Sequence, residues 1–207
     1  MMFSIPSPDP AIEISAFSQG MSKGLRQTEG PQVLVRPEVG IGPLFVGAFY
    51  KNVTSTTADG EAAILAGLRH RVGGFDLAAS AAYKWNTGAQ AQADRDCIEF
   101  TATASRRFGR VTPRISLTWS PDDLGGTGTS LYAEAGASFS LFTGASLSAS
   151  VSRRSRDGGP DYTAFNAGAT YAITRNFSAD LRYYDTAQSS LGVIYEPRAV
   201  ASLRVHF

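Results

Sequence analysis

Few side chains in this sequence are of a type that could carry out covalent or metal chemistry. One cysteine, Cys97, and two histidines, His70 and His206, are too few for an ordinary structural zinc site. The single cysteine also excludes an intrachain disulfide, and its position at the start of a predicted strand indicates a small strand residue rather than a reactive thiol. We therefore expect no catalytic residue, no metal site and no cofactor.

Glycine pairs and an acidic pair are the next candidates for ligand binding. Gly73-Gly74 and Gly125-Gly126 lack the Lys-Ser/Thr and the following helix of a phosphate-binding loop, so we predict turns at both. Asp122-Asp123 could touch a divalent cation, but a lone acidic pair after a proline favours a solvated loop start. Neither pattern predicts a ligand site.

The charge balance excludes one class of partner. Lys and Arg number 19 against 18 Asp and Glu, so the formal net charge is +1. A protein that binds nucleic acid through a large basic field is therefore not expected. Charged residues make up 18 % of the chain, below the roughly 25 % of an average soluble domain.

The elements that position these side chains are strands. Ser138 and Ser140 precede the turn Thr143-Gly144, and every second residue from Ser146 to Ser152 is again serine, which is a strand period broken by a turn. The same unit recurs along the chain and predicts twelve strands. Their expected spans are 11–22, 32–41, 44–53, 61–72, 75–86, 97–108, 111–120, 130–142, 145–154, 162–173, 177–186 and 197–207.

The connections between these strands alternate strictly between short turns and longer polar loops. This alternation, an even strand number and strands of about ten residues are typical of bacterial outer-membrane barrels. We therefore predict an all-β fold: a single twelve-stranded antiparallel transmembrane β-barrel over residues 11–207, with short periplasmic turns and longer extracellular loops. Residues 1–10 are expected to be a flexible N-terminal tail on the periplasmic side.

The two faces of the predicted strands differ in character. One parity is apolar and almost uncharged at mid-strand, whereas the other carries charges among Ser, Thr and Gly, as expected for lipid-facing and lumen-facing sides. Strand 44–53 is ambiguous, because Phe45 and Phe49 share one face and Val46 and Tyr50 the other. The charged residues expected to line the lumen are Glu13, Arg36, Glu38, Arg69, Arg71, Asp76, Lys84, Glu99, Arg107, Arg114, Glu134, Asp180, Arg182 and Arg204.

Aromatic residues near the strand ends give a second test, because Tyr, Trp and Phe collect where a membrane meets water. We expect two girdles, one at each end of the barrel. A soluble barrel or sandwich framed by aromatic residues is the alternative. The predicted girdle residues are Phe75, Phe108, Phe142, Tyr171, Phe177 and Phe207 near the short turns, and Phe49, Tyr83, Trp85, Trp119, Phe165 and Tyr183 near the long loops.

The outer surface of this predicted barrel offers two further candidate functions. A lipid-facing Ser-His hydrolase site near the outer leaflet is not expected, because His70 and His206 both fall near the short-turn end. Arg153, Arg154 and Arg156 lie where the ninth strand ends. They are candidates for contact with lipopolysaccharide phosphates, with a solvated charged loop as the alternative.

The chain ends in Leu203-Arg204-Val205-His206-Phe207, which resembles the terminal strand of Gram-negative outer-membrane barrels. This resemblance implies recognition by the barrel-assembly machinery through Phe207. The run 22–33 (SKGLRQTEGPQV), followed by 42–47 (GPLFVG) and Asn52-Val53, resembles the start of the proteobacterial TorF family of putative porins in a degenerate form. The family resemblance implies an outer-membrane protein.

These observations predict a channel for passive diffusion of small polar solutes through the outer membrane, and no enzyme. A weak preference for anions is expected if Arg69, Arg71, Arg107, Arg114 and Arg204 are not all neutralised by carboxylates. A non-conducting structural or surface-binding barrel and a soluble ligand-binding β-barrel are the alternatives. Residues 1–10 lack the pattern of a secretory signal, which favours the soluble alternative.

Overall fold

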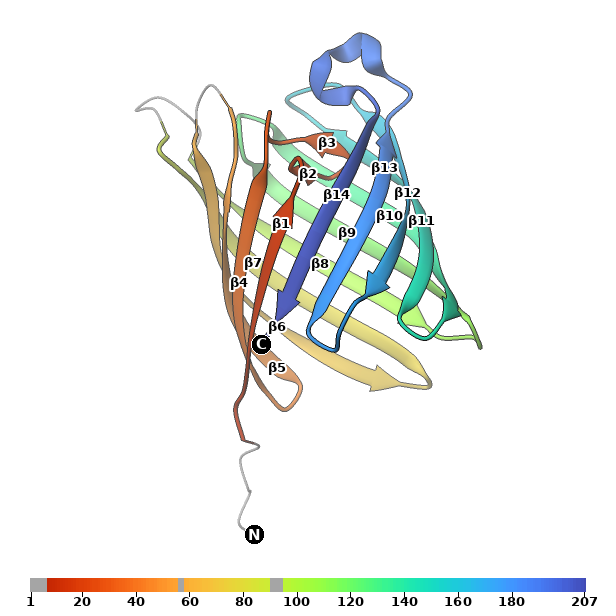
Figure 1. Cartoon of the computed structure of the whole chain (residues 1–207). Helices are drawn as coiled ribbons and strands as arrows, with labels where there is room; N and C mark the ends of the chain where they lie inside the picture. Colours follow the sequence, from red (N-terminus) through yellow and green to blue (C-terminus); the bar gives the residue numbers. More distant parts are fainter. Residues whose placement is uncertain (1–6, 56–57, 90–94) are drawn as a thin grey trace.

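The computed structural model describes residues 7–55, 58–89 and 95–207 of the chain. Twelve antiparallel strands form a closed barrel in which sequence neighbours pair and the last strand closes on the first (Figure 1). The predicted fold class is confirmed. The barrel strands are β1 (Asp9–Phe17), β4 (Gln32–Ile41), β5 (Leu44–Asn52), β6 (Gly60–Val72), β7 (Phe75–Thr87), β8 (Asp96–Arg106), β9 (Val111–Asp123), β10 (Gly128–Phe142), β11 (Ala145–Arg156), β12 (Tyr162–Ala172), β13 (Phe177–Asp185) and β14 (Arg198–His206).

The observed strands lie close to the predicted ones, with two exceptions. Strand β9 runs to Asp123, three residues beyond the predicted end. Strand β1 begins inside the segment expected to be a tail, because Asp9 and Pro10 pair with Gly40 and Val39 of β4. The same strand ends at Phe17, five residues early. Residues 1–6 of the predicted tail lie outside the described residues.

Short turns gather at one end of the barrel, here called the short-turn end, and longer connections at the other, the long-loop end (Figure 1). Gly42 and Gly73 have φ values of 59° each in these short turns, a left-handed conformation that glycine adopts at low cost. The C-terminus and the start of β1 lie at the short-turn end (Figure 1). One long connection, 124–127, is reduced to four residues because β9 and β10 extend beyond their predicted ends.

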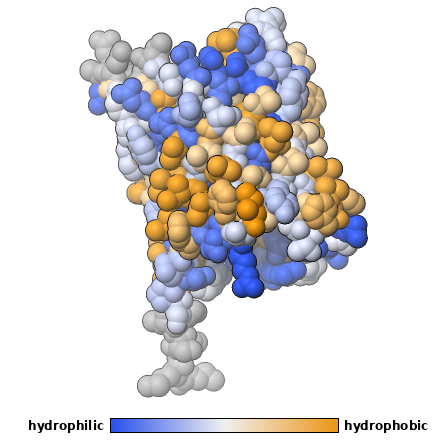
Figure 2. Space-filling view, viewed as in Figure 1, coloured by the Kyte–Doolittle hydropathy of each residue, from blue (hydrophilic) through white to orange (hydrophobic). Residues whose placement is uncertain are grey.

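The outer face of the barrel is apolar. Ile64, Ile115 and Leu181 are 57 %, 58 % and 61 % exposed, and apolar side chains cross the middle of the surface with hydrophilic ones toward its ends (Figure 2). A soluble monomer rarely exposes an apolar surface of this extent, so a lipid surrounding explains it better than water. Within the described residues, no helix is long and apolar enough to span a membrane.

The inner face holds polar groups and a small apolar cluster. The segment between β1 and β4 turns into the barrel and forms a short hairpin of β2 (Met21–Ser22) and β3 (Leu25–Arg26). The connection between β13 and β14 carries two 3₁₀ turns, η1 (Ser189–Leu191) and η2 (Val193–Tyr195). Leu25 of the hairpin and Tyr195 of η2 form the apolar cluster with Tyr162 and Ala164 of β12.

Candidate functional site

The β2–β3 hairpin reaches across the lumen and is tied to the opposite wall by one lysine. Lys23 Nζ lies 2.7 Å from Glu99 Oε2 on β8 and 2.9 Å from Asp123 Oδ2 on β9. The Lys23 side chain is only 12 % exposed. The sequence predicted a polar loop over 23–31, whereas the structure places this segment inside the barrel.

Local sequence explains why the hairpin folds inward. Lys23 and Gly24 occupy its turn with φ values of 49° and 84°, and Gly24 sits against Ala164 of β12, where a Cβ on residue 24 would lie 2.3 Å from the alanine Cβ. Tyr162 donates a hydrogen bond from its hydroxyl to the Lys23 carbonyl oxygen, at 2.7 Å. Leu25 buries its side chain in the apolar cluster, which a solvated loop would not do.

The lysine belongs to a chain of alternating charges on the inner wall near the long-loop end. Lys84 Nζ lies 3.1 Å from Glu61 Oε1 and 3.5 Å from Glu99 Oε2, and Lys51 Nζ lies 3.3 Å from Glu61 Oε2. Asp123 extends the chain to Arg154, at 2.7 Å. Because each buried charge has an opposite neighbour, this charge network can hold the hairpin against the wall without leaving an unpaired ion. It consists of Lys23, Lys51, Glu61, Lys84, Glu99, Asp123 and Arg154.

The last long connection covers the hairpin from the long-loop end (Figure 1). Tyr195 stacks edge-on against Tyr162, with 5.5 Å between ring centroids, and accepts a hydrogen bond from Arg156 at 2.5 Å. Arg156 also lies over the Tyr162 ring, 5.6 Å from its centroid. These contacts narrow the lumen at this end of the barrel.

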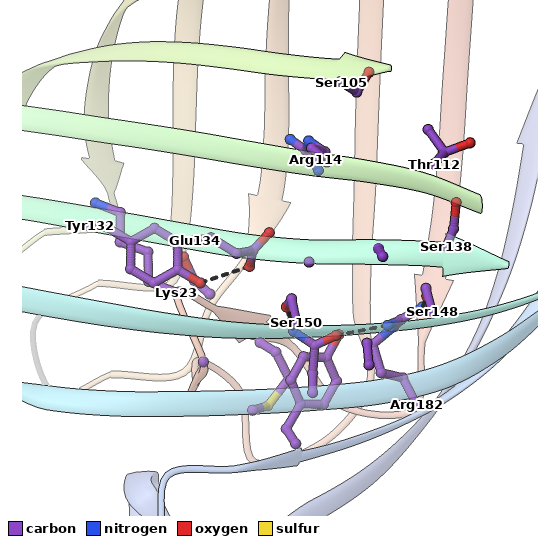
Figure 3. Close-up of a pocket in the computed structure, with 18 residues that line it drawn as sticks. Lys23, Ser105, Thr112, Arg114, Tyr132, Glu134, Ser138, Ser148, Ser150 and Arg182 are labelled. Carbon is purple, nitrogen blue, oxygen red and sulfur yellow. Dashed lines mark hydrogen bonds between the residues drawn. The ribbon is translucent and has the colours of Figure 1, made fainter. Parts of the chain in front are cut away.

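A cavity of about 520 Å³ lies in the lumen beside the hairpin (Figure 3). Its walls carry hydroxyl and amide groups from β8 to β13 together with a few charges. This surface offers many hydrogen-bonding groups to water or a polar solute. The hairpin contributes Met21 to Gly24, and the wall contributes Ser105, Thr112, Arg114, Tyr132, Glu134, Ser138, Ser148, Ser150, Asn166, Arg182 and Tyr184, among others.

The charges of this cavity differ in how they are held. Arg182 donates to Ser148 Oγ at 2.8 Å, to Asn166 Oδ1 at 2.8 Å and to Asp180 Oδ2 at 3.1 Å. Glu134 accepts a hydrogen bond from the Tyr132 hydroxyl at 3.0 Å. Among the described residues, no ion pair or hydrogen bond engages the guanidinium of Arg114.

The remaining charged residues predicted for the lumen occupy inward-facing positions of their strands, and most have hydrogen-bond or ion-pair partners. Arg69 forms a two-pronged contact with Glu38 at 2.5 and 2.7 Å. Arg204 Nε lies 3.5 Å from Glu13 Oε1. Arg71, Asp76 and Arg107 lie at the short-turn rim. Arg71 pairs with Asp76 at 3.4 Å, and Arg107 donates a hydrogen bond to the Gly109 carbonyl oxygen at 2.9 Å. Arg36 has no ion-pair partner in the described part of the chain.

The predicted girdle residues face outward with one exception. Phe142, Phe108 and Tyr171 near the short turns are 66 %, 56 % and 52 % exposed. Phe49 is wrongly placed in the prediction, because its ring faces the lumen beside Lys51, with 5.7 Å between Lys51 Nζ and the ring centroid. The other predicted girdle residues on the outer parity are Phe75, Tyr83, Trp85, Trp119, Phe165, Phe177, Tyr183 and Phe207.

The inner and outer faces of strand β5, which the sequence left ambiguous, can now be assigned. Phe45 is buried on the inner face beneath Arg69, whose guanidinium carbon lies 4.0 Å from the ring centroid. Val46 and Tyr50 are 56 % and 49 % exposed on the outer face. Tyr50 therefore occupies the outward position that the sequence prediction gave to its neighbour.

The arginine cluster predicted to contact lipopolysaccharide is divided by the strand period. Arg153 faces outward, 54 % exposed, and pairs with Asp161 at 3.2 Å. Arg154 faces inward to Asp123, and Arg156 is held by Tyr195, so neither presents its guanidinium on the outer surface. The prediction is wrong for these two residues.

Loop residue Asp161 accepts a hydrogen bond from the backbone N–H of Arg156, which holds the pKa of this carboxyl below its usual range, and a hydrogen bond from Ser155 adds to the effect. Asp161 is therefore ionised beside Arg153 at neutral pH. This neighbour reduces the positive field that Arg153 presents.

Asp123 and Cys97 also lie on the inner wall. The expectation of a solvated loop start is wrong for Asp123, which is 3 % exposed and paired with Lys23 and Arg154. Cys97 is buried, with its Sγ 4.0 Å from Asp123 Oδ1. The described residues hold no group of three or more His, Cys, Asp or Glu side chains placed to bind a metal ion.

Sequence reasoning missed the residues that join the hairpin to the wall. Lys51, Glu61 and Arg154 carried a signal, since each falls on the inner parity of its strand. Lys23 carried none from strand periodicity, because it lies in a connection. The one local indication was Leu25, an apolar residue within an otherwise polar segment.

Several solved structures are similar to this chain in fold. The KdgM porin superposes with a TM-score of 0.66 at 6 % identity, covering 95 % of this chain and 99 % of that one. The NanC porin gives 0.60 at 8 % identity, covering 94 % and 97 %. The COG4313 outer membrane channel from Pseudomonas putida F1 gives 0.55 at 13 % identity, covering 99 % and 96 %.

At these identities the likeness shows the fold: this chain has the twelve-stranded barrel architecture found in these outer-membrane channels. No protein-family model matches the chain, and no curated protein sequence matches it. Membership of the TorF family stays a prediction.

Proposed function

We propose that this protein is an outer-membrane channel for passive diffusion of small polar solutes. The observation that carries the proposal is a closed barrel with an apolar exterior and a hydrophilic cavity of about 520 Å³ in its lumen. A barrel wall in lipid satisfies every backbone group, and a polar interior offers solutes a hydrated path. The barrel architecture shared with the KdgM and NanC porins supports the channel proposal.

An anion preference would depend on arginines that differ in part from those expected from the sequence. Arg69, Arg71 and Arg204 each have a carboxylate partner, which cancels most of their field. Arg36, Arg107 and Arg114 have none among the described residues. A weak anion preference of the salt current would arise from these three side chains.

Recording single channels in a planar bilayer tests the proposal directly. We expect stepwise conductance, and a salt gradient should give a reversal potential shifted slightly toward the anion value at about 0.01 M salt, where the Debye length is about 30 Å. The shift should disappear near 1 M salt. A correctly folded barrel, identified by its heat-dependent electrophoretic mobility, that passes no current would overturn the channel proposal.

A non-conducting barrel is the second candidate, and the hairpin favours it. The β2–β3 hairpin and the connection carrying Tyr195 occupy the long-loop end. The charge network holds the hairpin against the wall, and Arg156 and Tyr162 hold Tyr195. In that case the unmodified protein would conduct no current. Conductance that appears only after the hairpin is released would favour this second candidate over a constitutively open channel.

Assembly and lipid contacts form part of the same proposal. Phe207 is 71 % exposed, and its backbone pairs with Ile12 of β1 through hydrogen bonds of 2.9 and 3.2 Å. This places an accessible aromatic side chain at the closing seam, as recognition by the barrel-assembly machinery would require. Lipid of the outer membrane would surround the apolar face, and lipopolysaccharide would contact Arg153.

A further inference from the structure

The inner cavity holds one positive and one negative group that do not neutralise each other. Arg114 on β9 and Glu134 on β10 both line it, and no ion pair joins them (Figure 3). Arg114 is paired in register with Gly136, so Glu134 is its diagonal neighbour, at a Cα separation of about 7–8 Å. Among the described residues neither group has an ion-pair partner, so two opposite charges remain available on one wall of the cavity.

The other charges of the cavity are already occupied. Lys23 is held by Glu99 and Asp123, and Arg182 is held by Asp180 together with Ser148 and Asn166. A solute that enters the cavity therefore meets one available guanidinium and one available carboxylate. Glu134 keeps its second carboxylate oxygen for a ligand, because the Tyr132 hydroxyl bonds only Oε2.

We propose that this cavity is a binding site for small zwitterions of the α-amino-acid class. The solute carboxylate would accept from the Arg114 guanidinium, which presents a planar pair of donors, and its ammonium would donate to Glu134. The surrounding hydroxyls of Ser105, Ser138 and Ser150 would solvate the rest of a small polar molecule.

The charge balance explains why a zwitterion is preferred. An anion would gain from Arg114 and be repelled by Glu134, a cation would experience the reverse, and only a molecule carrying both charges gains at both residues. A unit charge about 7 Å away in a water-like dielectric changes the local concentration about threefold. Small inorganic ions respond to the whole lumen, so the weak anion preference of the current and a preference for zwitterionic solutes are compatible.

The role of this site in transport rests on the proposed channel function. A set of small solutes of similar size tests the channel and the site separately. The probes are L-alanine, L-lactate, L-alaninamide and glycerol, which are a zwitterion, an anion, a cation and a neutral reference. Uptake of each labelled compound is measured in vesicles that contain the full chain. We expect alanine to enter at least about threefold faster than lactate or alaninamide relative to the glycerol rate.

Two variants give opposite expected shifts. Glu134→Gln should remove the advantage of alanine over lactate, and Arg114→Gln should remove its advantage over alaninamide. Arg175→Gln in an exposed short turn and Glu29→Gln in an exposed connection make the same charge changes outside the cavity, and should leave all ratios unchanged. Heat-dependent electrophoretic mobility establishes that each variant is folded.

The outcomes separate the two proposals. Glycerol entry with equal rates for alanine, lactate and alaninamide would leave the channel standing and overturn the zwitterion site, as would identical shifts in the two variants. If glycerol does not enter, the channel proposal fails. The site is then decided by calorimetric titration of alanine into the detergent-solubilised barrel. Binding that both variants weaken supports the site, and no binding overturns it.

Discussion

Lys23 and Glu99 are separated by 76 positions in the chain, yet the lysine Nζ and the glutamate Oε2 lie 2.7 Å apart inside the barrel. This ion pair joins a connecting segment to the wall opposite the strands from which it departs. The hairpin is therefore held by side chains rather than by the barrel's own hydrogen bonds. Its release would leave the twelve strands intact.

Lys23→Ala should increase channel conductance, or produce conductance in a barrel that is otherwise silent. Asp123 keeps Arg154 and Ser130, and Glu99 keeps Lys84, so the wall should stay folded. Single-channel recording measures the effect. Arg26→Ala removes a positive charge from the same hairpin without breaking any ion pair among the described residues, and should leave the conductance nearly unchanged. Equal conductance in both variants and the parent would show that Lys23 does not restrict the lumen.

Gly24→Ala should displace the hairpin by a steric route. A Cβ at this position would lie 2.3 Å from the Ala164 Cβ, and the φ of 84° is unfavourable for alanine. The same recording should show larger or less steady current than the parent. Gly73→Ala, at a short turn with φ of 59° and nothing within 4 Å of the added Cβ, carries backbone strain alone. A similar change of current in both variants would contradict the steric explanation.

Much of the barrel could be predicted because a strand in a lipid-facing wall has a simple period. Alternation placed Ile115 outward and Arg114 inward, and glycines such as Gly73 marked the turns. Periodicity failed where side chains pack across the lumen: Lys23 lies in a connection, and its partners belong to distant strands. Phe49 was misplaced because both faces of β5 carry aromatic residues, and only burial inside the closed barrel distinguishes them.

The charge network should contribute more to stability than the exposed ion pairs do. The Lys84 side chain is 9 % exposed and lies between Glu61 and Glu99. Lys84→Met removes a cation from two poorly hydrated carboxylates, so it should lower the free energy of unfolding by about 3 kcal/mol. Arg71→Met breaks a pair whose side chains are 72 % and 56 % exposed and should cost less than about 1 kcal/mol. Urea unfolding from lipid vesicles, followed by the fluorescence of Trp85 and Trp119, compares the two. Equal costs would contradict the buried network.

A charge on the outer face should be far more costly than one on the inner face. Ala102 lies on the outer face of β8, between Ala79 and Leu117 of the neighbouring strands, whereas Ser105 of the same strand lines the cavity. Ala102→Arg should cost about 2–4 kcal/mol in lipid vesicles, because the guanidinium faces hydrocarbon. Ser105→Arg adds the same group to a hydrated space and should cost much less. The same urea titration measures both, and the opposite order would mean that the apolar face does not contact lipid.

Contact with lipopolysaccharide should depend on Arg153 alone among the three neighbouring arginines. Its side chain is 54 % exposed on the outer parity, while Arg154 is paired inside with Asp123 and Arg156 is bonded to Tyr195. Asp161 partly neutralises Arg153, so Asp161→Asn should strengthen binding and Arg153→Gln should weaken it. The amount of lipopolysaccharide that copurifies with each folded variant measures the effect. Arg156→Gln is the matched control, because it removes an equal charge three positions away without changing the outer surface. A loss of lipopolysaccharide in the control as large as that in Arg153→Gln would mean that the general charge of the loops, rather than the outward guanidinium, attracts the phosphates.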